Sequence, residues 1–277
     1  MRQSIQCSSR YAALVLMAFA FVAVGCTSQS DVKPATGAPQ GYLAKTEVPD
    51  SLALLPAPPA KDSTAFAQDE AVSKEAHTMR DTPRWAQASR DAVLGFPEAA
   101  ETFSCALDAP VTQKESPHLY AMLARMLMDA GRTTAAAKNH YARTRPFVAY
   151  GESSCAPGDE PILRTNGSYP SGHTTIGWAW ALVLTEIAPE RTDAILARGR
   201  SFGESRLVCN VHWQSDVLQG FFLGAGLTAR LHANTEFRSD LEAAKQEIAA
   251  VRAKGLKPTR DCAAEATALS QKLKLVM

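Results

Sequence analysis

The chain has 277 residues, 46% of them hydrophobic, so it can bury the core of one large domain or of two small ones. Its 29 basic and 28 acidic side chains leave a formal net charge of +1, which excludes a global electrostatic field directed at nucleic acid. Any site for an anion must therefore be built locally from a few residues.

The first 25 residues predict a signal peptide for export. Arg2 and Arg10 make the start positive, residues 11–25 are apolar and uncharged, and residues 23–25 are small enough for a cleavage site. The apolar run is short for a bilayer span, which favours cleavage over a retained anchor. Because Cys26 follows directly, the segment also resembles a bacterial lipobox, although that motif prefers a larger residue than alanine at position 23. Lipidation of Cys26 and plain secretion both stay open.

Residues 26–60 are rich in Ser, Pro, Gly and Ala and predict a tether or an extended arm. Four cysteines follow this signal and arm, and an even number in an exported chain indicates two disulfide bonds with three possible connectivities. They are Cys105, Cys155, Cys209 and Cys262. No cysteine or histidine cluster has the spacing of a zinc site.

Residues 61–277 show helical periodicity without a convincing alternating strand pattern, so we expect one all-α domain, a compact helical bundle. Apolar spacing, caps and Pro or Gly stops predict helices over 117–131, 134–144, 173–187, 192–206, 216–231 and 239–255. In this pattern Gly131 ends the first helix, and Ser239-Asp240-Leu241-Glu242 is the capping box that starts the last. Gly220 and Gly224, one turn apart, indicate close packing between helices.

The segment from Ser205 to Asp216 carries groups suited to phosphoryl transfer. Arg206 is a permanent cation, and His212 is a possible nucleophile. Asp216 lies one helical turn after His212, where its carboxylate can hold the imidazole in one tautomer. A carboxylate in the first turn of a helix is also favoured by the helix dipole, and both interpretations of Asp216 can hold together.

A second segment, residues 167–174, lies where a helix is expected to begin. Helix N-termini bind phosphate through free N–H groups and a positive partial charge. Ser171 adds a hydroxyl, Gly172 has no side chain to block the backbone, and His173 can donate a proton. Taken alone, Ser171 would be an ordinary N-cap and His173 a surface histidine.

Lys138 and Arg145 form a third group, seven residues apart on an expected helix. Seven residues is close to two turns, so both side chains should point the same way. Two such charges usually mark a solvated basic face. Pro146 ends the helix just after Arg145 and would leave that guanidinium at the rim of a pocket.

Three motifs, in this order and spacing, resemble the signature of the type 2 phosphatidic acid phosphatase superfamily, which includes the vanadium-dependent haloperoxidases: Lys138-x6-Arg145-Pro146, Pro170-Ser171-Gly172-His173 and Ser205-Arg206-x5-His212-x3-Asp216. The amino-acid sequences of residues 143–147, 166–174 and 212–217 are most similar to those of the bacterial class A non-specific acid phosphatases. The resemblance covers roughly residues 50–250. It implies the helical bundle of the acid phosphatase/vanadium haloperoxidase type.

The resemblance also implies an activity: a hydrolase that needs no metal or other cofactor and cleaves a broad range of phosphate monoesters through a phosphohistidine. His212 would be the nucleophile, Asp216 its orienting carboxylate and His173 the general acid. The implied phosphate-binding residues are Lys138, Arg145, Ser171, Gly172 and Arg206. The chemistry fits these groups, because the transition state spreads negative charge over oxygens and two histidines in different surroundings can hold opposite protonation states.

Further expectations follow from the resemblance and the motifs. Cys155 and Cys209 flank the second and third motifs and are expected to pair, leaving Cys105 with Cys262. We expect a periplasmic protein, soluble or lipid-anchored at Cys26, that forms a homo-oligomer. Its substrates would be small phosphorylated molecules such as nucleotides, sugar phosphates and aryl phosphates, and not nucleic acid.

Two alternatives to a phosphatase remain at this point. The same anion pocket could hold vanadate in a haloperoxidase, or the chain could be a non-catalytic anion-binding lipoprotein. The pair His173 and His212 argues against simple binding, which needs neither a nucleophile nor a proton donor. Apyrase and phosphotransferase activity stay open.

Overall fold

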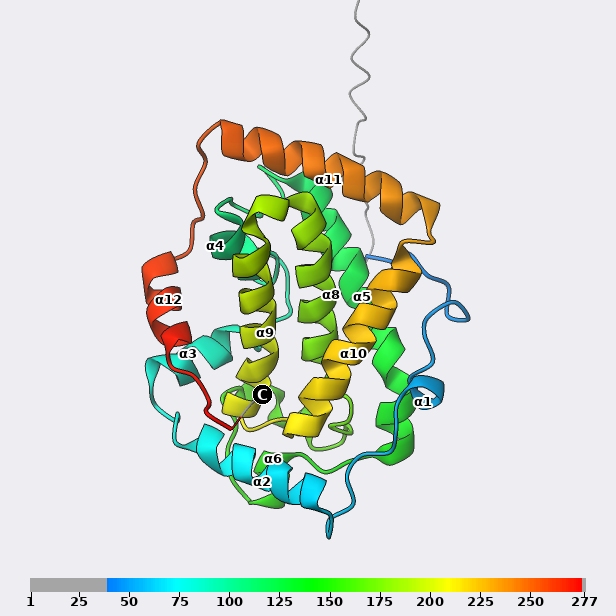
Figure 1. Cartoon of the computed structure of the whole chain (residues 1–277), viewed down its shortest axis with the longest axis vertical. Helices are drawn as coiled ribbons and strands as arrows, with labels where there is room; N and C mark the ends of the chain where they lie inside the picture. Colours follow the sequence, from blue (N-terminus) through cyan, green and yellow to red (C-terminus); the bar gives the residue numbers. More distant parts are fainter. Residues whose placement is uncertain (1–38, 276–277) are drawn as a thin grey trace, which may run out of the picture. The chain divides into compact units, whose positions relative to one another are not determined.

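The computed structural model describes residues 39–275, which form helices joined by loops and contain no strand (Figure 1). The expected all-α class is confirmed. The longer helices are α2 (Thr64–His77), α3 (Pro83–Arg90), α5 (Pro117–Tyr141), α8 (Gly172–Ile187), α9 (Thr192–Val208), α10 (Gln214–Leu231), α11 (Thr235–Ala253) and α12 (Cys262–Ser270). The short ones are α1 (Ser51–Leu54), α4 (Ser104–Leu107), α6 (Pro146–Ala149), α7 (Glu160–Leu163) and three 3-10 turns at Ala100–Phe103, Pro157–Asp159 and Pro189–Arg191.

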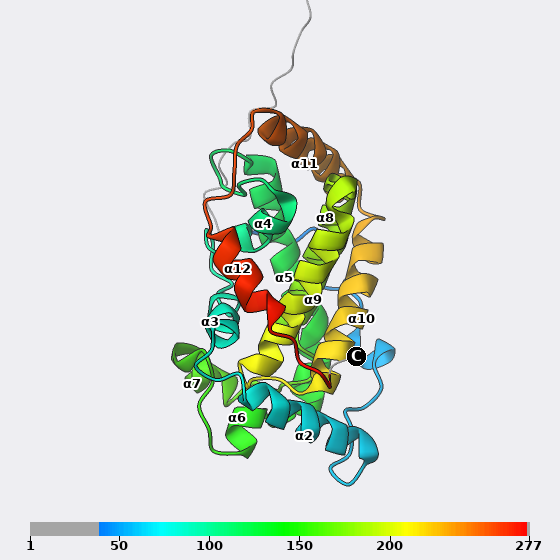
Figure 2. The ribbon, with the colours of Figure 1, turned by 60° about the vertical axis from the view of Figure 1, so that its left-hand side comes forward.

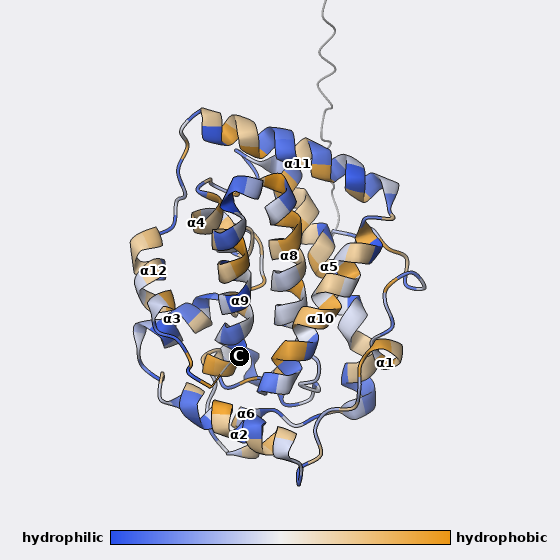
Figure 3. Cartoon of the chain, in the orientation of Figure 1, coloured by the Kyte–Doolittle hydropathy of each residue, from blue (hydrophilic) through white to orange (hydrophobic). Residues whose placement is uncertain are grey.

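Helix α8 is the centre of the packing. Its sequence carries no charged side chain between His173 and Glu186, and a helix that is apolar all round is stable only when other helices surround it. It packs against α5, α9 and α10, and α11 lies across its far end (Figures 1 and 2). Trp180 is fully buried there and donates its indole N–H to the Leu123 carbonyl at 3.1 Å. Figure 3 shows hydrophilic and hydrophobic residues alternating along α11, whose apolar side joins this core.

Two glycines let α10 lie directly against α8, as their spacing predicted. A Cβ atom on Gly220 would lie 2.7 Å from the Cβ of Thr174, and one on Gly224 would lie 2.8 Å from the Thr175 carbonyl oxygen. Both distances are below van der Waals contact, so larger residues would push the helices apart. The close approach lets the Ser171 amide donate to the Asp216 carbonyl at 2.9 Å and thereby joins two of the motif segments.

Helix α5 corrects two of the predictions. It runs without interruption through the exposed Gly131, where an added Cβ would meet nothing within 4 Å, and the alanine-rich turns that follow offset a glycine cost of about 1 kcal/mol. It ends at Tyr141, because Ala142 adopts a left-handed conformation with φ of 42°. Arg145 therefore does not share a helix with Lys138, and it is instead the N-cap residue of α6.

The capping box expected at Ser239–Glu242 is also wrong, because that stretch lies inside α11. The helix starts earlier, where the side chain of Asn234 accepts the Phe237 amide N–H at 2.9 Å. Its predicted end is correct, since Gly255 follows with φ of +70°. Helix α12 was not expected at all.

The described part of the N-terminal arm packs on α5. The amide groups of Tyr42 and Leu43 donate to the Asp129 carboxylate at 2.7 and 3.2 Å, and both side chains are buried. The expected signal peptide and Cys26 lie outside the described residues. None of the helices within residues 39–275 combines the length and apolarity that a membrane span requires.

Two disulfide bonds join the cysteine pairs named from the sequence. Cys105 bonds Cys262 with a Cα–Cα distance of 5.5 Å, and Cys155 bonds Cys209 with a Cα–Cα distance of 4.6 Å. The first ties α12 to α4. The second ties the loop after α6 to the end of α9, directly beside the segment that carries His212.

Candidate active site

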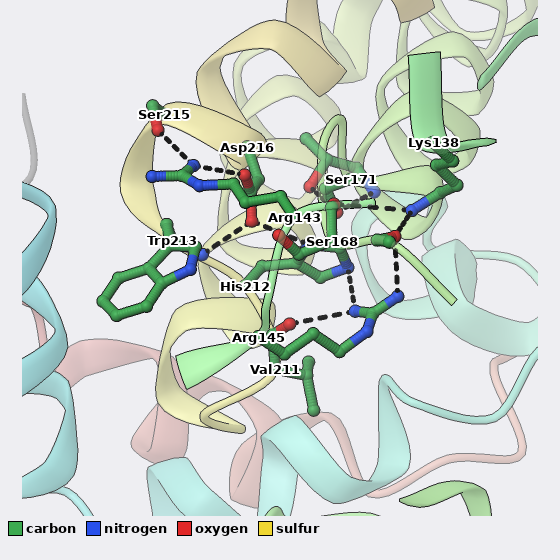
Figure 4. A network of polar contacts seen from close by, with 12 residues as sticks. Lys138, Arg143, Arg145, Ser168, Ser171, Val211, His212, Trp213, Ser215 and Asp216 are labelled. Atoms are coloured by element: carbon green, nitrogen blue, oxygen red, sulfur yellow. Dashed lines mark hydrogen bonds and ion pairs between the residues drawn. The ribbon is translucent and has the colours of Figure 1, made fainter. Parts of the chain in front are cut away.

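The three motif segments meet where α5 and α9 end and α8 and α10 begin (Figure 4). Lys138 reaches from α5 to the Gly167 carbonyl, with its Nζ 2.9 Å from the oxygen. Arg145 reaches the Val211 carbonyl at 2.9 Å. The residues that the sequence predicted as one site are therefore neighbours in space, although two of them do not share the helix we expected.

His212 is fixed in one tautomer by its two neighbours. Its Nδ1 lies 3.3 Å from Asp216 Oδ2, and its Nε2 lies 3.1 Å from Arg145 Nη1. A carboxylate can only accept a hydrogen bond and a guanidinium can only donate one. The proton is therefore on Nδ1, and Nε2 presents a lone pair. Burial and the charges of Arg145, Lys138 and Arg206 lower the pKa of His212 well below its usual value, which keeps the ring neutral.

Asp216 makes both of the contacts that its position predicted. It is fully buried in the first turn of α10, where Oδ2 accepts the Trp213 amide N–H at 2.9 Å and caps the helix. The same oxygen faces His212 Nδ1. Helix capping thus fixes the carboxylate in the position from which it contacts the imidazole.

Three cations act electrostatically on His212: Arg145 and Arg206 are buried and Lys138 is partly buried. Burial and mutual repulsion lower the pKa of Lys138 to about 7, that of Arg145 to about 10 and that of Arg206 to about 9. Arg206 is 1% exposed, and its Nε and Nη1 find no hydrogen-bond partner within residues 39–275. A buried charged donor without a partner is costly. An anion such as phosphate would satisfy these groups and relieve their repulsion.

The start of α8 supplies the remaining predicted groups. Ser171 is the N-cap, and its Oγ accepts hydrogen bonds from the Thr174 amide at 3.3 Å and the Thr174 hydroxyl at 2.9 Å, which leaves its own hydrogen free to donate. Gly172 is the first helical residue. A Cβ there would make only ordinary contacts, the nearest at 3.8 Å, so sterics alone do not require this glycine.

His173 is oriented by a backbone carbonyl. Its Nε2 lies 2.9 Å from the Ala92 oxygen, and because a carbonyl only accepts, Nε2 carries the hydrogen and Nδ1 is left for another partner. Burial and the positive charge of Arg206 lower the pKa of His173 well below its usual value. The ring is therefore a stronger acid than an exposed histidine.

Comparison with known proteins identifies the family. The model of the PAP2 superfamily matches residues 117–239, which contain all three motif segments. The non-specific acid phosphatase of Providencia stuartii is 46% identical over 209 residues, which cover 75% of this chain and 84% of that protein. The chain belongs to the PAP2 superfamily.

Two further relatives place it among the acid phosphatases of this superfamily. The non-specific acid phosphatase of Salmonella typhimurium is 40% identical over 76% of this chain and 84% of its own length. The acid phosphatase of Zymomonas mobilis is 38% identical over 72% of this chain and 75% of its own length. The chain is an acid phosphatase of the PAP2 superfamily, as its motifs indicated.

Sequence reasoning missed two residues of this PAP2 site. Arg143 donates to Asp216 Oδ1 at 2.6 Å and to Asp69 Oδ2 at 2.7 Å. Arg143 lies two residues before Arg145, within the stretch 143–147 that is similar to the class A acid phosphatases. These two closely spaced arginines were the sequence signal that could have identified it. Asp69 lies on α2, ahead of every motif, and no local pattern distinguishes it from a surface acid.

A cavity of about 340 Å³ lies next to α3 and the loop after α6. Ala92, whose carbonyl orients His173, is part of its wall. The other wall residues are Ser89, Val93, Leu94, Gly95, Cys155, Ala156, Gly158 and Asp159.

The described residues hold no group of three or more His, Cys, Asp or Glu side chains arranged to bind a metal ion. The positive charges that act on His212 are those of Arg145, Lys138 and Arg206.

Proposed function

We propose that this acid phosphatase is exported and hydrolyses a broad range of small phosphate monoesters through a phosphohistidine on His212, without a metal. The observation that carries the proposal is the state of His212: Nδ1–H faces Asp216, while the lone pair of Nε2 faces the buried Arg145 guanidinium, and Lys138 and Arg206 add positive charge nearby. A neutral imidazole with its lone pair beside an anion-binding site is suited to attack phosphorus.

In the first step, the phosphate group would bind between the three cations and the N-terminus of α8. Lys138, Arg145 and Arg206 would neutralise its oxygens, and the Ser171 hydroxyl and Gly172 amide would donate to them. Nε2 of His212 attacks phosphorus, and the bond to the ester oxygen breaks. The negative charge of the bound phosphate offsets that of Arg206, so in acidic solution His173 takes up a proton at Nδ1. It donates this proton to the leaving oxygen, so that an alcohol departs rather than an alkoxide.

In the second step, the roles of His173 reverse. Its Nδ1, now unprotonated, accepts a proton from water as the water oxygen attacks phosphorus. The phosphorus–Nε2 bond breaks, inorganic phosphate leaves, and His212 returns to its neutral tautomer. Asp216 accepts the Nδ1–H throughout and stabilises the positive charge that the ring carries while it is phosphorylated.

Two observations support export. Two disulfide bonds are typical of an oxidising compartment, and residues 1–25 have the pattern of a signal peptide. We therefore propose a periplasmic protein, either soluble or lipid-anchored at Cys26. Nucleotides, sugar phosphates and aryl phosphates remain the expected substrates, and a homo-oligomer remains the expected assembly.

Replacement of the nucleophile tests the function. His212→Ala should abolish turnover of p-nitrophenyl phosphate and leave the thermal unfolding cooperative. His140→Ala is the matched control, because His140 is an exposed histidine at the end of α5 and should keep full activity. Full activity of His212→Ala would refute the proposal.

A further inference from the structure

We propose that Arg143 and Asp69 are positioning residues for the nucleophile, which hold the Asp216 carboxylate in the orientation that accepts the Nδ1–H of His212. This inference rests on the proposed function, in which His212 attacks phosphorus. Asp69 lies outside the three motifs that carry the family resemblance, Arg143 is a position of the first motif to which no role was assigned, and neither would touch substrate.

The first argument is the geometry of the Asp216 carboxylate, which is held at both oxygens. Oδ1 accepts from Arg143 Nη1 at 2.6 Å, and Oδ2 accepts from the Trp213 amide at 2.9 Å and faces His212 Nδ1 at 3.3 Å (Figure 4). Without Arg143, a single hydrogen bond from the helix cap would orient the carboxylate. Its plane could then rotate and turn the accepting lone pair away from the imidazole.

The second argument is the charge balance around Arg143. The guanidinium is shared, because Nη2 pairs with Asp69 Oδ2 at 2.7 Å while Nη1 pairs with Asp216. All three side chains are at most 9% exposed, so water screens these charges little. Asp69 offsets the charge of Arg143 and leaves the negative charge of Asp216 available to the imidazole when it becomes positive on phosphorylation.

The third argument is that Asp69 reaches the site from a separate element. It lies on α2, and its Oδ1 accepts the Ser215 amide at 2.7 Å at the start of α10. Ser215 Oγ lies 2.7 Å from Arg143 Nη1 and also donates to Asp69 Oδ2 at 2.6 Å. The docking of α2 therefore fixes both Arg143 and the first turn of α10, which carries Asp216.

Aromatic packing holds the guanidinium in this place. Arg143 lies 5.5 Å from the ring centre of Trp213 and 5.8 Å from that of Phe66, which is also on α2. The two rings contact one another at 5.3 Å. Arg143 thus has little freedom to leave Asp216, which is the property that a positioning residue needs.

Three variants and one control test the inference on the full chain. Asp69→Asn keeps the shape of the side chain and removes its charge. Arg143→Met removes the guanidinium, and Arg143→Lys keeps the positive charge. Arg125→Met is the matched control, because Arg125 also bridges two carboxylates, those of Glu236 and Asp240, away from the site.

Three readouts separate positioning from simple anchoring of α2. They are the rate of phosphohistidine formation in rapid-quench experiments with p-nitrophenyl phosphate, the ratio of kcat to KM effects, and the ¹⁵N chemical shifts of the His212 ring. We expect Arg143→Met to slow phosphohistidine formation on the order of 10- to 100-fold with little change in KM. The Nδ1–H tautomer of His212 should become mixed. Asp69→Asn should show a smaller loss in the same direction, and Arg143→Lys should recover much of the rate.

The inference is overturned if Arg143→Met and Asp69→Asn lower the melting temperature, as Arg125→Met does, but leave the rate of phosphohistidine formation and the His212 tautomer unchanged. If Arg143→Met does not fold, the isosteric Asp69→Asn and the conservative Arg143→Lys decide by the same readouts. Failure of the proposed function would look different, because the wild-type protein itself would then form no phosphohistidine.

Discussion

Arg206 offers a test in which activity and stability should change in opposite directions. Its guanidinium is buried at the end of α9, and two of its nitrogens lack a hydrogen-bond partner within the described residues. Burial and the neighbouring Arg145 lower its pKa to about 9, so the folded protein holds this charge at a cost in free energy. Arg206→Met removes the charge and the two unpaired donors but keeps a long apolar stem.

The expected gain in stability of Arg206→Met follows from the removal of the two unpaired guanidinium donors. Leaving a buried donor unsatisfied costs about 1–3 kcal/mol, and part of the gain is lost because methionine fills less volume. We expect a net increase in unfolding free energy of about 1–3 kcal/mol, which for a chain of this size raises Tm by roughly 2–10 °C. Phosphatase activity should be lost, because one of the three cations that bind phosphate is gone.

Thermal unfolding with and without inorganic phosphate measures both effects. Phosphate should raise the Tm of the wild-type protein and should have little effect on Arg206→Met, since a ligand stabilises only the state that binds it. Arg198 provides the control on the same helix. It is also buried but pairs with Asp91 and Glu265, so Arg198→Met should destabilise by about 3–5 kcal/mol. The reasoning is refuted if Arg206→Met is less stable than wild type without phosphate, or gains as much Tm from phosphate.

Three further predictions concern the chemistry. His173→Ala should lose more activity on an alkyl phosphate than on p-nitrophenyl phosphate, because only a poor leaving group needs the proton of His173; equal losses in a steady-state comparison would contradict this role. The pKa of Lys138 is lowered to about 7, so its positive charge is present below that pH and lost above it. We therefore expect KM to rise as the pH increases through about 7. A KM that is independent of pH from 5 to 9 would count against the cation site. Dialysis against EDTA should leave kcat unchanged, and vanadate should compete with substrate. If EDTA inactivates the enzyme and added metal restores its activity, the metal-free mechanism is excluded.

The central helices follow from the sequence, because local chemistry specifies them, and the convergence of the three motifs was implied by the family resemblance. The apolar run of α8 can only be buried, and the small faces of Gly220 and Gly224 predict its close packing on α10. Asp216 follows His212 by four residues, and a helix that begins between them brings its first-turn carboxylate back toward the imidazole. These features depend on few residues and short spacings.

The errors arise where a local signal competes with packing. Gly131 can end a helix, yet α5 continues through it because the following residues favour a helix. Arg145 has the spacing of a neighbour of Lys138, but the left-handed Ala142 redirects the chain before it. Asp69 was missed because its contacts are with Arg143 and Ser215, which are 74 and 146 residues away in the chain.

The most direct test of the account is the identity of the covalent intermediate. Rapid-quench of the wild-type protein with ³²P-labelled substrate should trap a phosphoryl group that is stable in base and labile in acid, and peptide mapping should place it on His212. His212→Ala should trap none, and His140→Ala should trap as much as wild type. A phosphoryl group on any other residue, or steady turnover by His212→Ala, would contradict the mechanism derived from the tautomer of His212.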